Sequence, residues 1–264
     1  MATTKRRALI EERVVALGEI HFATLANEFQ VSEMTIRRDV DALEDKGVVR
    51  RVVGGAIALV GKSSEPTFES RAAQAAVEKE HMAGAVVELL RPHETVILDS
   101  GSTVLAVAKA IRGRGLGLTV VTPSILVAIE LADDEGTTVL LTGGQLRPGE
   151  LSLIGPEAEA TFALYNCDTY VMGVAGVDGK RGITEYHREE GNVKRAAMRA
   201  ADRVIVVADK TKLGRVQLMS IAALGEVSAL VTDGLETDSA VQTAAEAGVE
   251  IICVDESGAQ EGAL

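Results

Sequence analysis

The chain has 264 residues, 47% of them hydrophobic, and a formal net charge of -12 at pH 7. Its length favours a small domain followed by a larger one, and no apolar run approaches the roughly 18 residues that a membrane-spanning helix needs. The amino-terminal segment lacks the apolar core and cleavage site of a secretory signal, so we expect a soluble, cytoplasmic protein without membrane association.

The first 60 residues have the pattern of three short helices followed by a β-hairpin. Apolar residues at helical spacing predict one helix over 4–17 and a shorter one over 24–29. Ser32 stands at the N-cap position of a third helix, which we expect to run to about Lys46 and to end at Gly47.

The third helix has two different faces. Ile36, Val40 and Leu43 recur at i, i+4 and i+7 and predict the buried stripe. At 100° per residue, Arg37 and Arg38 fall on the opposite side, so we expect both to face solvent or a partner.

Two β-prone runs, 48–53 and 56–60, flank the pair Gly54-Gly55 and predict a hairpin. Three helices followed by such a hairpin form the outline of a winged helix-turn-helix in residues 1–60. Residues 61–70, GKSSEPTFES, are rich in Gly, Ser and Pro and are expected to form a linker.

Charge separates the first 60 residues from the rest of the chain. Of the 27 basic and 39 acidic residues, nine of each lie in residues 1–60, so the remaining 18 and 30 give residues 61–264 the whole net charge. An acidic body repels nucleic acid, so any contact with DNA must come from a local basic cluster. Three such clusters are available: Lys5-Arg6-Arg7, Arg37-Arg38 and Arg50-Arg51.

Residues 71–264 alternate between helices and strongly apolar strands. We expect helices over 71–90, 103–111, 124–132, 191–201 and 237–247. We expect strands over 95–99, 118–122, 137–142, 169–174, 203–208, 228–232 and 249–254. This alternation predicts an α/β fold, with a doubly wound and mostly parallel sheet that helices cover on both faces.

Ligands of such sheets gather beyond the carboxyl ends of the strands, and polar residues follow several of the predicted strands. The richest stretch is Asp99, Ser100, Gly101, Ser102 and Thr103. The glycine permits close backbone approach, and the hydroxyls and amides precede a helix whose positive end favours an anion such as phosphate. An ordinary N-cap with a tight turn explains this stretch, taken alone, equally well.

Other polar segments also have plain structural readings. Residues 176–184 could form a glycine hairpin, and Glu190, Lys194 and Arg195 could be a solvated helix face. Lys212 could lie in water, although it follows a strand end where its charge could balance a phosphate.

Neither the cysteines nor the histidines have the spacing of a known site. Cys167 and Cys253 form no CxxC pair, and the histidines at 21, 81, 93 and 187 are scattered. We therefore expect buried, unpaired cysteines, no metal site and no cofactor. No P-loop and no complete GxGxxG fingerprint is present either.

The stretch VSEMTIRRDVDALEDKGVVRRVVGGA resembles the signature of the DeoR family of bacterial sugar-operon regulators. The resemblance continues through PTFESR, LDSGST, GVDGKRGIT, EEGNVKRAAM and ADKTKLGR, and so covers about residues 5–255. It implies an N-terminal winged helix-turn-helix and a C-terminal sensor similar in fold to ribose-5-phosphate isomerase. It also implies repression of carbohydrate genes and a phosphorylated sugar or polyol as effector.

By this resemblance, residues 99–103 match the phosphosugar loop, and Asp178, Lys194 and Lys212 match other polar positions of the family's pocket. Two positions depart from the family pattern. Val53 stands where a histidine commonly precedes Gly-Gly-Ala, which bears on a contact of the wing. Pro123 stands where an asparagine commonly follows the strand-end threonine, which bears on a hydrogen bond to the effector.

Two hypotheses remain open. As a regulator, the chain would place its recognition helix through phosphate contacts of Ser32 and Thr35 and read the major groove with Arg37 and Arg38. Arg50 and Arg51 on the wing would hold the DNA backbone. Paired operator half-sites would call for a homodimer or homotetramer.

As an enzyme, the chain would be a sugar-phosphate isomerase or transferase. Asp99 or Asp178 would then act as the base and Lys212 as an electrostatic stabiliser. Such an enzyme has no need of residues 1–60, so the amino-terminal module favours the regulator.

Overall fold

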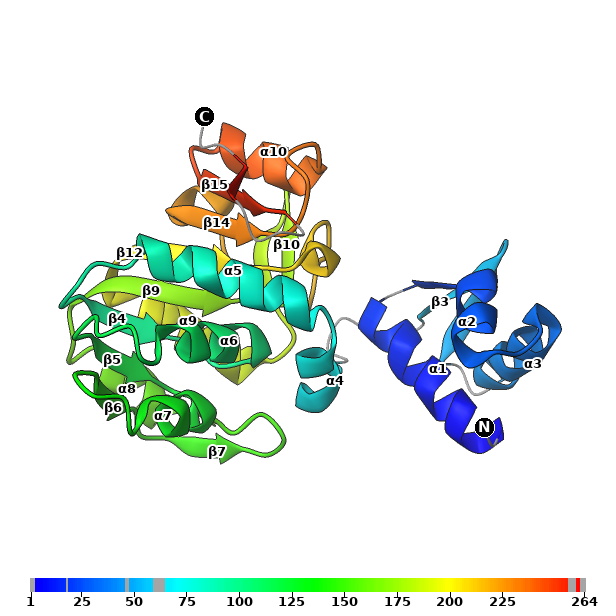
Figure 1. Cartoon of the computed structure of the whole chain (residues 1–264), viewed down its shortest axis with the longest axis horizontal. Coiled ribbons are helices and arrows are strands. Elements are labelled where there is room, and N and C mark those ends of the chain that lie inside the picture. The colour runs from blue at the N-terminus through cyan, green and yellow to red at the C-terminus, as the bar shows by residue number, and fades with distance from the viewer. Residues whose placement is uncertain (1–2, 18, 46–47, 59–64, 256–259, 262–264) are drawn as a thin grey trace. The chain divides into compact units, whose positions relative to one another are not determined.

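The computed structural model describes residues 3–17, 19–45, 48–58, 65–255 and 260–261. The chain forms two units, Met1–Arg71 and Ala72–Leu264 (Figure 1). Among the described residues, no helix has the length and apolar character needed to cross a lipid bilayer. Both cysteines are buried and neither forms a disulfide, as their spacing predicts.

Three helices pack against a small sheet in the amino-terminal unit. The helices are α1 (Thr3–Leu17), α2 (Phe22–Phe29) and α3 (Glu33–Glu44). The antiparallel strands are β1 (Glu19–His21), β2 (Val49–Val52) and β3 (Gly55–Ala58), in the order β1-β3-β2. The predicted winged helix-turn-helix is therefore confirmed in outline.

The predicted stripe of α3 is confirmed, because Ile36, Val40 and Leu43 are all fully buried. The boundaries differ in detail. Helix α2 begins two residues earlier than expected because Phe22 packs into the same core. Helix α3 ends at Glu44, while the expected stop at Gly47 and the expected strand end at 59–60 lie outside the described residues.

An eight-stranded sheet, of which seven strands run parallel, organises the second unit. Its parallel strands are β4 (Thr95–Leu98), β5 (Thr119–Thr122), β6 (Thr138–Leu141), β9 (Cys167–Gly173), β12 (Ala201–Val207), β14 (Ala229–Thr232) and β15 (Glu250–Val254). All seven lie where the apolar runs predict them. The strand order is β16-β15-β14-β12-β9-β4-β5-β6, in which β16 (Gln260–Glu261) pairs antiparallel with β15. Chain order therefore reverses direction between β4 and β9.

Helices cover both faces of this sheet (Figure 1), which confirms the doubly wound fold. One core contains apolar residues from α5 (Ala76–Leu89), α6 (Ser102–Ile111) and α7 (Ile125–Leu131). The core on the other face contains residues from α8 (Pro156–Phe162), α9 (Arg188–Arg199) and α10 (Ser239–Glu246). Successive residues of β4 alternate between the two cores, because strand side chains point to opposite faces.

Two smaller antiparallel sheets accompany the main sheet. A hairpin joins β7 (Gln145–Arg147) to β8 (Ser152–Ile154). The expected glycine hairpin is present as β10 (Gly176–Asp178) and β11 (Gly182–Glu185), and β13 (Met219–Ala222) pairs with β11.

The single helix expected over 71–90 is wrong at its start. The structure has a short helix α4 (Phe68–Ala73) and then α5, with Ala75 in the left-handed conformation between them at φ 52°.

Candidate functional site

The reversal between β4 and β9 is the place where a doubly wound sheet opens a crevice at its carboxyl edge. Strand β4 ends at Leu98 and leads directly into the loop 99–103. The Asp99 amide donates to the carbonyl of Val171 on β9 at 3.1 Å, so the two strand ends stay together as far as this residue.

Lys194 of α9 reaches this carboxyl edge of the sheet. Its Nζ donates to Asp99 Oδ2 and, at 2.8 Å, to the carbonyl of Gly173 at the end of β9. Its Nζ also lies 3.4 Å from Glu185 Oε2 on β11. Lys194 is only 3% exposed and Glu190 is also buried, so the reading as a solvated helix face is wrong for these two residues, whereas Arg195 is exposed.

Burial and the neighbouring charges shift the pKa values of Asp99 and Lys194. It raises the pKa of the Asp99 carboxyl above its ordinary value, although Lys194 opposes that shift. Burial alone would lower the pKa of Lys194, but the carboxylates of Asp99, Glu185 and Glu190 outweigh it and raise that pKa. Lys194 is therefore a fixed cation near neutral pH, suited to binding and unsuited to attack on a carbonyl.

Glu190 belongs to a buried cluster of charge with Lys194, Asp99 and Glu185, and its closest partners come from the β7–β8 hairpin. Its Oε2 forms an ion pair with Arg147 Nη1 at 2.8 Å, and its Oε1 accepts from the Ser152 hydroxyl at 2.7 Å; both partners lie in the β7–β8 hairpin. Burial would raise the pKa of Glu190, but Arg147, Lys194 and the Ser152 hydroxyl hold it below its ordinary value.

Tyr170 of β9 is buried beside Asp99. Within the part of the chain that the structure describes, its hydroxyl has no hydrogen-bond partner of good geometry. Burial, together with the charge of Asp99, raises the pKa of Tyr170 well above its ordinary value, so the hydroxyl keeps its proton. A protonated and unsatisfied hydroxyl at this place can donate to an oxygen of a ligand.

The loop 99–103 has the features of an anion site. Ser100 donates its amide to Asp99 Oδ1 at 2.8 Å, and Gly101 forms the N-cap of α6 at φ 101°. Ser102 begins the ten-residue helix, and its hydroxyl lies 3.2 Å from Lys79 Nζ. Thr103 follows in the first turn and is partly exposed. The free amides of the first helical turn can hold an anion here.

Asp178 and Lys212 lie on adjoining segments. Val177 pairs with Leu213 through a parallel bridge, which brings β10 beside the 3-10 helix Lys210–Lys212. Asp178 accepts from the amides of Lys180 and Arg181 and so closes the β10–β11 turn. Lys212 is buried, which contradicts its reading as a loop lysine in water.

Pro123 is buried at the end of β5, where its carbonyl accepts from the Leu153 amide at 2.7 Å. Val53, by contrast, is fully exposed in the turn between β2 and β3. The two departures from the family pattern thus fall at a strand end of the sheet and at the tip of the wing.

In the amino-terminal unit, Ser32 caps α3 as predicted. Its hydroxyl accepts from the Thr35 amide at 3.3 Å and lies 3.0 Å from the Thr35 hydroxyl. Helix α2 ends with Gln30 in the left-handed conformation, which makes the tight turn into α3.

The two arginines of α3 are not equivalent. Arg38 is exposed and has no ion-pair or hydrogen-bond partner among the described residues. The Arg37 guanidinium lies 5.2 Å from the ring centroid of Phe22, and its Nη2 lies 3.5 Å from Glu33. Arg38 is therefore the arginine that is free to meet a partner.

The wing is tied to α3. Arg51 Nη1 lies 2.6 Å from Asp41 Oδ1, and the Arg51 amide donates to Glu44 at 2.9 Å. Arg50, on the same strand, is exposed. The wing and the recognition helix are thus held as one surface.

The cluster Lys5-Arg6-Arg7 is not the free basic patch that the sequence suggests. Arg6 is buried, and Arg6 and Arg7 both bind the buried Asp39 of α3, at 2.6 and 2.8 Å. A run of basic residues predicts exposed side chains. It cannot show that an acidic partner, here Asp39, lies more than 30 positions away along the chain.

Comparisons with known proteins agree with both units. Residues 6–60 match the DeoR-like helix-turn-helix domain, and residues 74–234 match the DeoR C terminal sensor domain. The putative aga operon transcriptional repressor of Escherichia coli O157:H7 is 34% identical over 96% of this chain and 95% of its own length. The glycerol-3-phosphate regulon repressor of Escherichia coli K12 is 31% identical over 92% of this chain and 95% of its own.

Among solved structures, ribose 5-phosphate isomerase A of Methanocaldococcus jannaschii has a TM-score of 0.40 at 15% identity, over 53% of this chain and 55% of its own. That likeness is too distant to say anything about activity. The full-length relatives are transcriptional regulators and not enzymes, which decides against the isomerase hypothesis. Since the matched domains together span both units, the chain belongs to the DeoR family of transcriptional regulators.

Proposed function

We propose that this regulator is a cytoplasmic repressor of carbohydrate genes that a phosphorylated sugar or polyol releases from its operator. The observation that carries the proposal is the buried Lys194–Asp99 pair at the strand reversal, where Asp99 begins the loop 99–103. Its relatives include repressors named for the aga operon and for the glycerol-3-phosphate regulon.

The two ends of such an effector require different partners. Its phosphate fits the loop amides, the hydroxyls of Ser100, Ser102 and Thr103 and the start of α6, with Lys212 as a balancing cation. Its hydroxyls fit the crevice around Asp99, where carboxylate oxygens accept and the unsatisfied Tyr170 hydroxyl donates. In this proposal Lys194 holds Asp99 in place, and Asp178 lies at the rim.

On the DNA side, α3 enters the major groove with Arg38 toward the bases and Arg37 beside it. Ser32 and Thr35 at the start of the helix contact phosphate, and Arg50 and Arg51 on the wing hold the backbone. A single α3 reads few base pairs, so we infer a homodimer or homotetramer on paired half-sites.

We assign DNA binding to residues 1–60, linkage to 61–70 and effector sensing to 71–264. The division of the structure between Arg71 and Ala72 is compatible with this assignment.

A thermal-shift screen of the full chain tests effector binding. The probes are glycerol 3-phosphate and pentose, hexose and amino-sugar phosphates, each paired with its unphosphorylated counterpart. A ligand of the folded state at 100 times its Kd stabilises by about 2.7 kcal/mol, so we expect a rise in Tm for at least one phosphorylated member. Equal shifts within every pair, or no shift at all, would count against a phosphate site.

A further inference from the structure

The break between α4 and α5 is not encoded in the local sequence. Residues 71–77 read RAAQAAV, without glycine or proline, and alanine is the strongest helix former. Ala75 nevertheless adopts φ 52° and ψ 41°, a conformation that costs an L-residue free energy and persists only where surrounding contacts impose it.

The Lys79 side chain makes such a contact, because its Nζ reaches back to the Gln74 carbonyl at 2.8 Å. The Lys79 amide donates to the Ala75 carbonyl at 2.9 Å, a bond that a continuous helix would also have. In an uninterrupted helix the Gln74 carbonyl would accept from the amide of Glu78 instead. The buried Lys79 side chain therefore replaces a helical hydrogen bond with one that requires the break.

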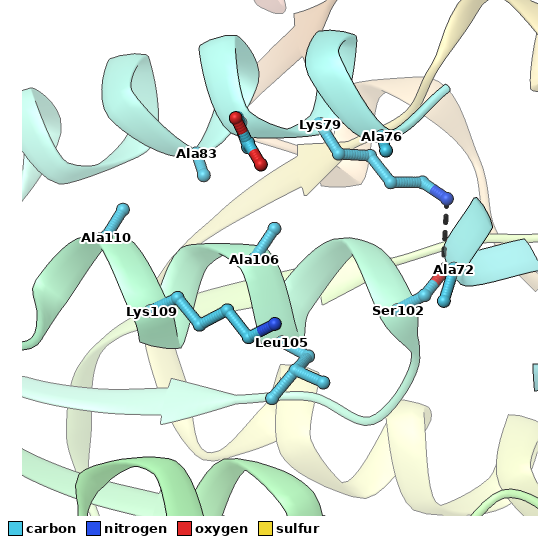
Figure 2. A pocket seen from close by; sticks show the side chains of 10 residues that line it. Ala72, Ala76, Lys79, Ala83, Ser102, Leu105, Ala106, Lys109 and Ala110 are labelled. Atoms are coloured by element: carbon cyan, nitrogen blue, oxygen red, sulfur yellow. Dashed lines mark hydrogen bonds between the residues drawn. The ribbon is translucent and has the colours of Figure 1, made fainter. Parts of the chain in front are cut away.

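The Lys79 ammonium also contacts the loop 99–103, the proposed anion site. Lys79 Nζ lies 3.2 Å from the Ser102 hydroxyl, across a groove of about 340 Å³ between α5 and α6 (Figure 2). Charge-assisted hydrogen bonds usually measure about 2.7–2.9 Å, so the contact with Ser102 is the weaker of the two. A phosphate oxygen bound at the loop can compete for this ammonium.

We propose that Lys79 is a positioning residue that couples occupancy of the loop 99–103 to the junction of α4 and α5. An anion at the loop draws the ammonium away from the Gln74 carbonyl. Ala75 then returns to the right-handed conformation, and α4 and α5 join into one helix. The coupling rests on the proposed effector site, and it acts on the stretch of chain that follows the DNA-binding unit.

Amide hydrogen exchange of the full chain tests, without any ligand, whether Lys79 maintains the break between α4 and α5. The first-turn amides of α5, at Ala76, Val77 and Glu78, lack helical partners in the broken form and gain them in the continuous helix. We expect Lys79→Met to slow their exchange about tenfold, the shift in equilibrium expected when one left-handed alanine is relieved. Unchanged or faster exchange would overturn the proposal.

Three further variants make the result specific. Lys79→Arg keeps a buried donor and is expected to retain fast exchange. Adding Ala75→Gly to Lys79→Met is expected to restore it, because glycine adopts the left-handed conformation freely. Lys109→Met removes an exposed lysine from the other wall of the same groove (Figure 2) and is expected to change nothing.

A second experiment separates this inference from the proposed function. Inorganic phosphate and the sugar phosphates of the screen are added to the wild-type chain, and exchange is followed in residues 99–103 and 76–78. Protection of both segments supports the coupling, whereas protection of the loop alone refutes it and leaves the effector site standing. If no phosphate protects the loop, the effector site fails, and the Lys79→Met result alone decides whether the break depends on Lys79.

Discussion

At Glu190, a buried carboxylate stays ionised because Arg147, Ser152 and Lys194 surround it. Its pKa in the folded chain lies below the ordinary value of 4.5. A lowered pKa contributes stability at pH values above 4.5, and that contribution is lost as the pH falls through the folded-state pKa. Glu190 therefore makes the fold more sensitive to acid.

Substitution of Glu190 by glutamine tests this effect. We expect Glu190→Gln to lower stability at neutral pH and to reduce the further loss below pH 4.5, measured by urea unfolding across pH. Its exposed neighbour Glu189 provides the matched control, since Glu189→Gln also removes one negative charge but lies outside the buried cluster. Parallel stability curves for Glu190→Gln and the wild type would show that the carboxylate is not held as described.

Arg38 is the residue on which recognition of DNA should depend most. Because it is exposed and unpaired among the described residues, its loss removes a DNA contact without disturbing the fold. We expect Arg38→Ala to weaken operator binding by roughly 1–3 kcal/mol if a base contact is lost. Arg37→Ala should also disturb the packing on Phe22.

Fluorescence anisotropy with a labelled operator measures the Arg38 effect. Arg114→Ala, which removes an exposed arginine from the second unit, is the charge control. Equal affinities for Arg38→Ala and Arg114→Ala would remove Arg38 from the interface.

At the residue scale, the sequence pointed to part of the crevice. Asp99 and Lys194 were found through family motifs, and both lie at the strand reversal. Arg147, Tyr170 and Glu185 were missed because each comes from a different strand. No spacing along the chain links them, and only the fold brings them to one place.

At the scale of elements, Asp39 fastens the recognition helix to α1. Its two oxygens bind Arg6 and Arg7, and it is only 2% exposed. Removing one partner of a buried ion pair leaves uncompensated charge, so we expect Asp39→Ala to destabilise the amino-terminal unit by about 3–5 kcal/mol. Asp41 of the same helix pairs with Arg51 in an exposed position, and Asp41→Ala should cost at most about 1 kcal/mol.

Thermal unfolding of the two variants, followed by circular dichroism, compares these costs directly. Equal losses for Asp39→Ala and Asp41→Ala would mean that the buried cluster does not hold α1 to α3.

The elements themselves were predictable to different degrees. The parallel strands other than the edge strand β6 are largely buried on both faces, and all seven read as apolar runs that were found from sequence. The two strands of the β7–β8 hairpin have only three residues each, which is too short for a periodic signal. The break at Ala75 was missed because a side chain four residues later imposes it against local propensity.

At the scale of the whole molecule, the acidic charge of residues 61–264 leaves the neutral amino-terminal unit as the part suited to DNA. If effector and operator favour different states of the chain, each must weaken the binding of the other by the same factor. This reciprocity is the central claim of the proposed function, and factors of about 5–150 are typical of such coupling.

The most direct measurement is therefore a pair of titrations on the full chain with the phosphorylated compound that raises Tm. We expect that saturating compound weakens operator binding and that saturating operator weakens compound binding by an equal factor. Operator affinity that stays the same with and without the bound compound would contradict the account.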